Sequence, residues 1–158
     1  MKLIRATKNR YHFRLTKWEK NLLVSVLKLY PRIPPAHQPL SKVARLPDQE
    51  SSQSLLDEAL AEQRAENKKQ IQQWLADPRR FCESEKGLRL SLSPAEVEWL
   101  LQVLNDVRVG SWIFLGSPDE RRPLQILNET TAPHLWAIEM ADYFQTRLLE
   151  ALEGERSA

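Results

Sequence analysis

Alternating apolar and polar residues indicate a short strand at 88–92, directly before the best-defined helix of the chain. The leucines of this stretch alternate with an arginine and a serine, the period-two pattern of a strand with one buried face. Ser93 then takes the N-cap position, and Glu96 is placed to complete a capping box. The helix is expected to reach about residue 115. Its apolar residues recur at helical spacing: Val97, Leu100, Leu101, Leu104 and Val107.

The N-terminal part repeats this design. Short strands are expected near residues 2–6 and 11–15, and a second capping box precedes a helix at about 17–30. The two strand–cap–helix stretches match at an offset of 77 residues: Leu15 with Leu92, Thr16 with Ser93, Glu19 with Glu96, Val26 with Val103, and Leu27 with Leu104. This echo predicts a pseudo-symmetric core whose strands join one sheet. The alternative is a chance echo, because capping boxes are common.

Five prolines predict a long loop at 31–53, because proline disfavours helix interiors and central strands. A helix is expected at about 54–76, and residues 79–86 are predicted to be a polar connector. The last helix should run from about 131 to 152, with Gly154 as its stop.

These elements predict a single domain, 1–158, of the mainly α class. The expected architecture is a compact bundle of about four helices with a small antiparallel sheet. The sheet would be built from the short strands near residues 2–6, 11–15 and 88–92.

Composition favours a cytoplasmic protein. Apolar residues make up 42% and charged residues 28% of the 158 residues, and no apolar run approaches the roughly 20 residues that span a bilayer. The N-terminus lacks the apolar core of a secretion signal. A single cysteine, Cys82, excludes an internal disulfide and favours a reducing compartment.

The net charge of +2 conceals a lopsided distribution. Residues 1–46 hold eleven Lys and Arg against one acid, whereas residues 47–158 hold twelve against twenty. The basic segment could bind nucleic acid, with aromatic residues interleaved among the charges, or it could pair with the acidic remainder of the chain. The candidate basic surface consists of Arg10, Arg14, Lys17, Lys20 and Lys28, and the interleaved aromatic residues are Tyr11, Phe13, Trp18 and Tyr30.

No catalytic motif is present in the sequence. His12, His37 and His134 have no second histidine or cysteine at a metal-ligand spacing, and there is no glycine-rich phosphate loop and no nucleophile elbow. Cys82 lies near two arginines but has no histidine partner in its sequence context. The sequence therefore predicts neither an enzyme nor a metal or cofactor site.

The C-terminal half resembles an uncharacterised bacterial family, domain of unknown function 2017. The residues that carry the resemblance are Leu92, Ser93, Glu96, Trp99, Leu100, Leu104, Asn105, Asp106 and Arg108, together with the last helix. The glycine that this family places four residues after the arginine is replaced here by Trp112. The family has no assigned activity. Its genes often neighbour an adaptor of the bacterial N-end-rule protease, so the resemblance implies an accessory role in regulated proteolysis.

The leading functional hypothesis is a non-enzymatic protein-interaction or regulatory module, with a homodimer as its simplest form. It rests on a last helix that is apolar on more than one face and on an aromatic tail of the preceding helix. The candidate interface residues are Trp112, Phe114, Trp136, Met140, Tyr143 and Phe144. Nucleic-acid binding through the basic N-terminal segment is the alternative.

Arg108 falls within the apolar stripe of its predicted helix, where the pattern calls for leucine. A guanidinium cannot lose its proton, so a buried Arg108 requires a carboxylate partner. Asp142, or else Glu139, is the predicted partner on the last helix. Two alternatives are an anion site formed by Arg108 with Asn105 and an arginine that reaches solvent.

Overall fold

The computed structural model describes residues 1–35, 49–124 and 126–156. Much of the predicted proline-rich loop, including His37, lies outside the described residues. The elements are, in order, β1 (Lys2–Thr7), β2 (Arg10–Leu15), α1 (Lys17–Leu27), α2 (Gln49–Ala76), β3 (Phe81–Ser84), β4 (Gly87–Leu92), α3 (Pro94–Phe114) and α4 (Ala132–Arg156).

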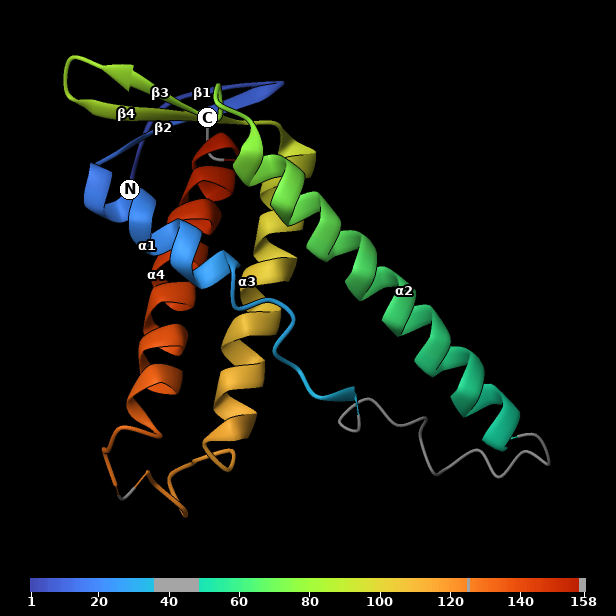
Figure 1. Ribbon diagram of the computed structural model, residues 1–158. Coiled ribbons are helices and arrows are strands. Elements are labelled where there is room, and N and C mark those ends of the chain that lie inside the picture. The colour runs from blue at the N-terminus through green and yellow to red at the C-terminus, as the bar shows by residue number, and fades with distance from the viewer. Residues whose placement is uncertain (36–48, 125, 157–158) are drawn as a thin grey trace.

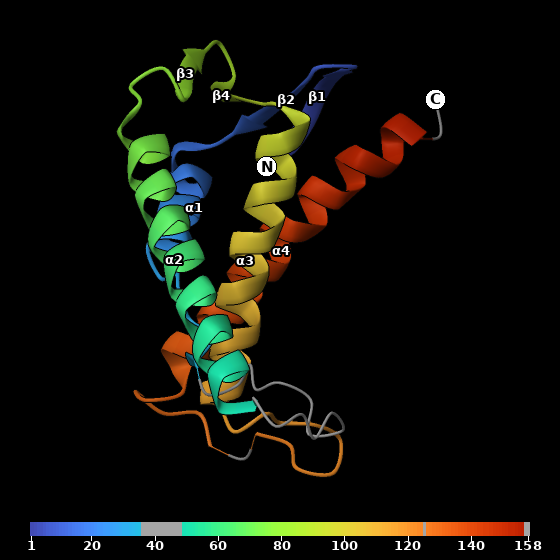
Figure 2. The ribbon, with the colours of Figure 1, turned by 90° about the vertical axis from the view of Figure 1, so that its right-hand side faces the viewer.

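The strands form one antiparallel sheet in the order β1-β2-β4-β3. In Figures 1 and 2 the described helices lie on one side of this sheet, and its other face carries no helix. The covered face supplies much of the hydrophobic core, because every second residue of β2 and β4 points into it. These buried residues are Tyr11, Phe13, Leu15, Leu88, Leu90 and Leu92.

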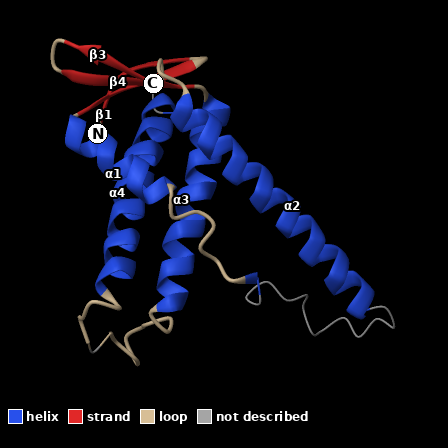
Figure 3. Ribbon diagram, viewed as in Figure 1, coloured by secondary structure: helices blue, strands red, loops and turns tan. Residues whose placement is uncertain are grey.

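The expected mainly α bundle is wrong. About 60% of the chain is helical, and a four-stranded sheet accounts for about 16%, so the fold is mixed α/β with a helical majority (Figure 3). The three predicted strands form, but the predicted connector at 79–86 contains a fourth, β3. Strand β3 is a short edge strand with polar residues at two of its four positions, so its sequence lacks the alternation that marks β4.

Helix boundaries also differ from the predicted ones. Helix α1 ends at Leu27 rather than Tyr30, and α2 begins at Gln49, inside the predicted loop. Helix α4 continues through Gly154 to Arg156. Glycine lowers helix stability by only about 1 kcal/mol relative to alanine, so a helix can continue through it.

The chain is built from two ββαα units: β1, β2, α1 and α2, then β3, β4, α3 and α4. Phe13 lies opposite Leu90 in the central strand pair, and these residues are 77 positions apart, which is the offset of the sequence echo. That pair therefore marks a pseudo-two-fold axis between β2 and β4. Both predicted capping boxes are present, at Thr16 with Glu19 and at Ser93 with Glu96. The echo thus reflects a repeated structural unit.

The two units differ most in their helix pairs. Helix α3 extends to Phe114 and gives α4 a partner along much of its length, whereas α1 ends at Leu27. The first half of α2 consequently projects away from the other helices (Figure 1), and α2 buries only Ile71 and Trp74. At the repeat positions of the buried α4 residues Ala137, Ala141 and Phe144, α2 has the half-buried residues Leu60, Arg64 and Asn67.

The segment after α1 crosses α3 in close contact. The Asp106 carboxylate accepts hydrogen bonds from the backbone N–H of Arg32 (2.6 Å) and of Ile33 (3.2 Å). A Cβ at Gly110 would lie 2.3 Å from the carbonyl carbon of Arg32. Gly110 lies inside α3, and its lack of a side chain gives the crossing segment room to pass.

Candidate functional site

The uncovered face of the sheet is strongly basic. Directly opposed residues in an antiparallel sheet place their side chains on the same face. The pairings Lys2–Arg14–Arg89 and Arg5–His12–Ser91 alternate with the buried pairs, so they face away from the helices. We define the basic sheet face by six residues: Lys2, Arg5, Arg10, His12, Arg14 and Arg89.

No acidic residue occupies an outward paired position of the four strands. The other outward positions on β1, β3 and β4 are Thr7, Cys82, Ser84 and Ser91. Among the described residues, none of the six basic side chains forms an ion pair. Their charge is therefore available to an external anion.

His12 lies within this positive field. Its Nδ1 lies 2.7 Å from the Ser91 hydroxyl oxygen. Partial burial lowers the pKa of the His12 imidazole below its ordinary value, and the nearby charges of Arg89, Arg5 and Arg10 lower it further. A bound anion would act in the opposite direction, because negative charge favours the imidazolium.

A pocket of about 560 Å³ lies at the β3 side of the basic sheet face. Its lining comes from the start of β2, the turn before β3, strands β3 and β4, and the start of α3. The lining residues are Arg10, Asp77, Arg79, Arg80, Cys82, Arg89, Ser91, Ser93 and Glu96.

Arg80 forms one wall of the pocket and is fixed in place. Its guanidinium lies 2.6 Å from Glu96 Oε1 and 3.9 Å from Asp77 Oδ2, and it stacks over the Trp74 ring at 4.7 Å. Burial raises the pKa of the Glu96 carboxyl, but the Ser93 N–H and Arg80 outweigh it, so the pKa lies below its ordinary value. Glu96 therefore stays charged and keeps Arg80 occupied. Arg79 lies 3.6 Å from the Asp77 carboxylate, so of the pocket arginines Arg10 and Arg89 form no ion pair among the described residues.

Comparison with protein-family models, with curated proteins and with solved structures gave no match. No described helix is both long and apolar enough to cross a membrane. Within residues 1–35, 49–124 and 126–156, no group of three His, Cys, Asp or Glu side chains is placed to hold a metal ion.

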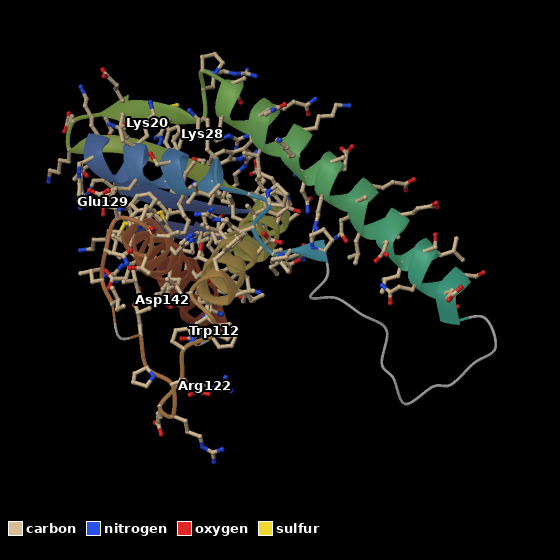
Figure 4. All side chains as sticks on the ribbon, turned by 60° about the horizontal axis from the view of Figure 1, so that its bottom comes forward. Lys20, Lys28, Trp112, Arg122, Glu129 and Asp142 are labelled. Atoms are coloured by element: carbon tan, nitrogen blue, oxygen red, sulfur yellow. The ribbon has the colours of Figure 1, made fainter. Side chains whose placement is uncertain are left out.

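The structure divides the predicted basic surface. Arg10 and Arg14 lie on the basic sheet face. Lys17 and Lys20 instead belong to α1 on the covered side of the sheet, and Lys28 is the residue that directly follows this helix (Figure 4 labels Lys20 and Lys28). Lys17 lies 3.9 Å from the Glu83 carboxylate, and Lys20 lies over the ring of Phe81. The interleaved aromatic residues are not available either: Tyr11, Phe13 and Tyr30 are buried, and Trp18 alone is exposed.

Sequence reasoning missed Lys2, Arg5 and Arg89 as members of the site. The alternation in 88–92 already placed Arg89 on the polar face of its strand. The sequence did not reveal that β2 pairs with β4, and this pairing places Arg14 opposite Arg89. Cross-strand register, not a run of basic residues, creates the site.

The predicted ion pair of Arg108 does not form in the described structure. Arg108 is half-buried, and its guanidinium donates to Asn105 Oδ1 (3.0 Å) near the surface, while Asp142 and Glu139 are exposed. The physical reason is that Arg108 lies at the flank of the buried stripe beside Val107. From there a long side chain can reach the surface.

The predicted interface residues fall into two groups. Trp112, Phe114 and Trp136 are exposed at the end of the α3–α4 hairpin. Phe144 is fully buried, Met140 packs against the core, and the Tyr143 hydroxyl donates to Glu19 Oε1 (2.6 Å). The second group belongs to the fold rather than to a free surface.

Proposed function

We propose that this protein binds the sugar–phosphate backbone of nucleic acid through the basic sheet face, without a catalytic step. The observation that carries this proposal is the placement of six basic side chains on an uncovered sheet face whose paired positions hold no acid. Binding of phosphates by such a face releases counterions and needs no base contact.

Two features favour nucleic acid over an acidic protein. Protein interfaces have an apolar core, whereas the paired outward positions of this sheet hold only charged, polar or small side chains and Cys82. Four of the six basic residues are arginines, whose planar guanidinium matches phosphate oxygens. Because the sheet aromatics Tyr11 and Phe13 point into the core, the face offers no platform for stacking bases.

Binding should depend strongly on salt. With about five phosphate contacts, one for each lysine or arginine of the face, the slope of log K against log salt should be about −4.5 for duplex DNA at neutral pH. The double variant Arg5→Gln/Arg89→Gln should bind more weakly to every sequence and reduce the slope by about 2. Fluorescence anisotropy with a labelled duplex from 50 to 200 mM salt measures both quantities.

The matched control is Arg121→Gln/Arg122→Gln, which removes the same charge from two exposed arginines in the loop after α3. Figure 4 shows Arg122 at the end of the molecule remote from Lys20 and Lys28. The control should retain wild-type affinity. No binding by the wild-type protein at 50 mM salt, or equal loss in both double variants, would refute the proposal. An acidic polypeptide that binds where DNA does not would assign the face to a protein ligand.

The pH dependence of binding provides a second test of the proposal, through His12. Its pKa is lowered in the free protein by burial and by Arg89, Arg5 and Arg10. Bound phosphates should raise that pKa, so a proton is taken up on binding. Affinity should therefore increase as the pH falls through the range in which His12 titrates.

A second candidate function is self-association through the exposed end of the α3–α4 hairpin. Five large apolar side chains are exposed there: Trp112, Phe114, Ile126, Leu127 and Trp136. We expect a concentration-dependent dimer in sedimentation, and Phe114→Asp should shift it to monomer. A wild-type monomer at high concentration would exclude this candidate.

The resemblance to domain of unknown function 2017, the accessory role in regulated proteolysis and the cytoplasmic location remain predictions from the sequence. Neither proposed surface depends on them.

A further inference from the structure

We infer that the pocket at the β3 side of the basic sheet face binds a terminal phosphate monoester of a nucleic-acid strand. The inference rests on the proposed function and adds to it: the sheet face holds the strand, and the pocket receives its phosphorylated end. Arg10 and Arg89 belong to both surfaces, so a strand lying on the face leads directly into the pocket.

The charge of the pocket suits a dianion. Four arginines and two carboxylates line it, which leaves an excess of two positive charges. Glu96 and Asp77 are engaged by Arg80, and Arg79 Nε lies 3.6 Å from Asp77. Arg10 and Arg89 form no ion pair among the described residues. A phosphate monoester carries about −1.5 to −2 charges at neutral pH, more than an internal phosphodiester.

Hydroxyl donors complete the pocket. Ser93 accepts a hydrogen bond from the Glu96 N–H (3.2 Å) with its oxygen, so its own O–H remains able to donate to a ligand. Ser91 is within hydrogen-bonding distance of His12 Nδ1. When His12 is protonated, Nδ1–H donates to the Ser91 oxygen and leaves the Ser91 O–H to donate to the ligand.

The shape of the pocket favours a strand end. The turn at 77–80 and strand β3 supply part of the lining, while Arg10 and Arg89 connect the pocket to the basic sheet face. A phosphodiester within a strand must continue in two directions, whereas a monoester at a strand end needs only one opening. The extra terminal oxygens of the monoester can accept from Arg10, Arg89 and Ser93.

The test compares one single-stranded oligonucleotide in three forms: with a 5′-phosphate, with a 3′-phosphate and with hydroxyls at both ends. Anisotropy at a single salt concentration gives the three affinities. We expect one phosphorylated form to bind about tenfold or more tightly than the hydroxyl form, the effect of one well-placed charge-assisted contact. Inorganic phosphate should compete for the pocket and so abolish this difference in affinity.

Two variants locate the effect. Arg89→Gln, in the pocket, should remove the preference for the phosphorylated end, whereas Arg5→Gln, on the same face but outside the pocket, should weaken all three forms alike. Both side chains are exposed, and circular dichroism should show both variants folded.

Equal affinity of the wild-type protein for all three forms overturns the terminal-phosphate inference while leaving nucleic-acid binding by the face intact. A preference lost equally in Arg5→Gln overturns the assignment to the pocket. Absence of binding to any form at low salt overturns the proposed function itself.

Discussion

Replacing Leu104 by alanine is expected to lower the free energy of unfolding by about 2–5 kcal/mol. Leu104 is a fully buried residue of α3 and belongs to the hydrophobic core. The substitution removes apolar contacts and leaves a cavity that close-packed neighbours fill only in part. Urea denaturation at constant m-value measures the change.

Leu149→Ala on α4 is the matched control. Its side chain is 47% exposed, so the same substitution removes little buried surface and should cost less than about 1 kcal/mol. Similar losses in the two variants, or a loss under 1 kcal/mol for Leu104→Ala, would contradict the placement of the α3 core stripe.

Alanine substitutions at the two helical glycines are expected to have opposite effects. At Gly110 a new Cβ would lie 2.3 Å from the carbonyl carbon of Arg32 and 2.5 Å from the Ile33 nitrogen. Both are backbone atoms, so the crossing segment must move and strain its hydrogen bonds to Asp106. Overpacking of this kind costs about 1–3 kcal/mol, which exceeds the gain of about 1 kcal/mol in helix propensity.

At Gly154 the space around the new Cβ is open, since no heavy atom beyond its chain neighbours and its own helix backbone lies within 4 Å. Gly154→Ala should therefore stabilise the protein by up to about 1 kcal/mol through helix propensity alone. Thermal melting of the two variants beside wild type measures the signs. Stabilisation by Gly110→Ala would show that the segment at 31–35 does not pack on α3 as described.

Local signals explain what the sequence could predict about the fold. The capping boxes at Thr16 and Ser93 and the alternation of β2 and β4 depend on neighbouring residues only, and all are present. Strand β3 exists because β4 offers it a free edge, which no property of its four residues reveals. A short, sheet-dependent strand of this kind turned the expected helical bundle into a mixed α/β fold.

The candidate site was predictable only in part for the same reason. The excess of basic residues in 1–46 was visible, and Arg10 and Arg14 belong to the site. Arg89, however, comes from β4, 75 or more positions away, and only strand register brings it beside Arg14. The Arg108 prediction failed because a helical wheel gives a direction but not how far a flanking guanidinium can reach.

The pseudo-two-fold axis at Phe13 has a consequence for direction. A chain of half this length, with one ββαα unit, would build the same sheet only by pairing with a second copy of itself. The two ends of the open face would then carry the same side chains. Because both units lie in one chain, their residues can differ. Where the first unit has Arg5 and Arg10, the second has Cys82 and Gly87. The two ends of the open face therefore differ, and a nucleic-acid strand bound across it would contact different side chains at each end.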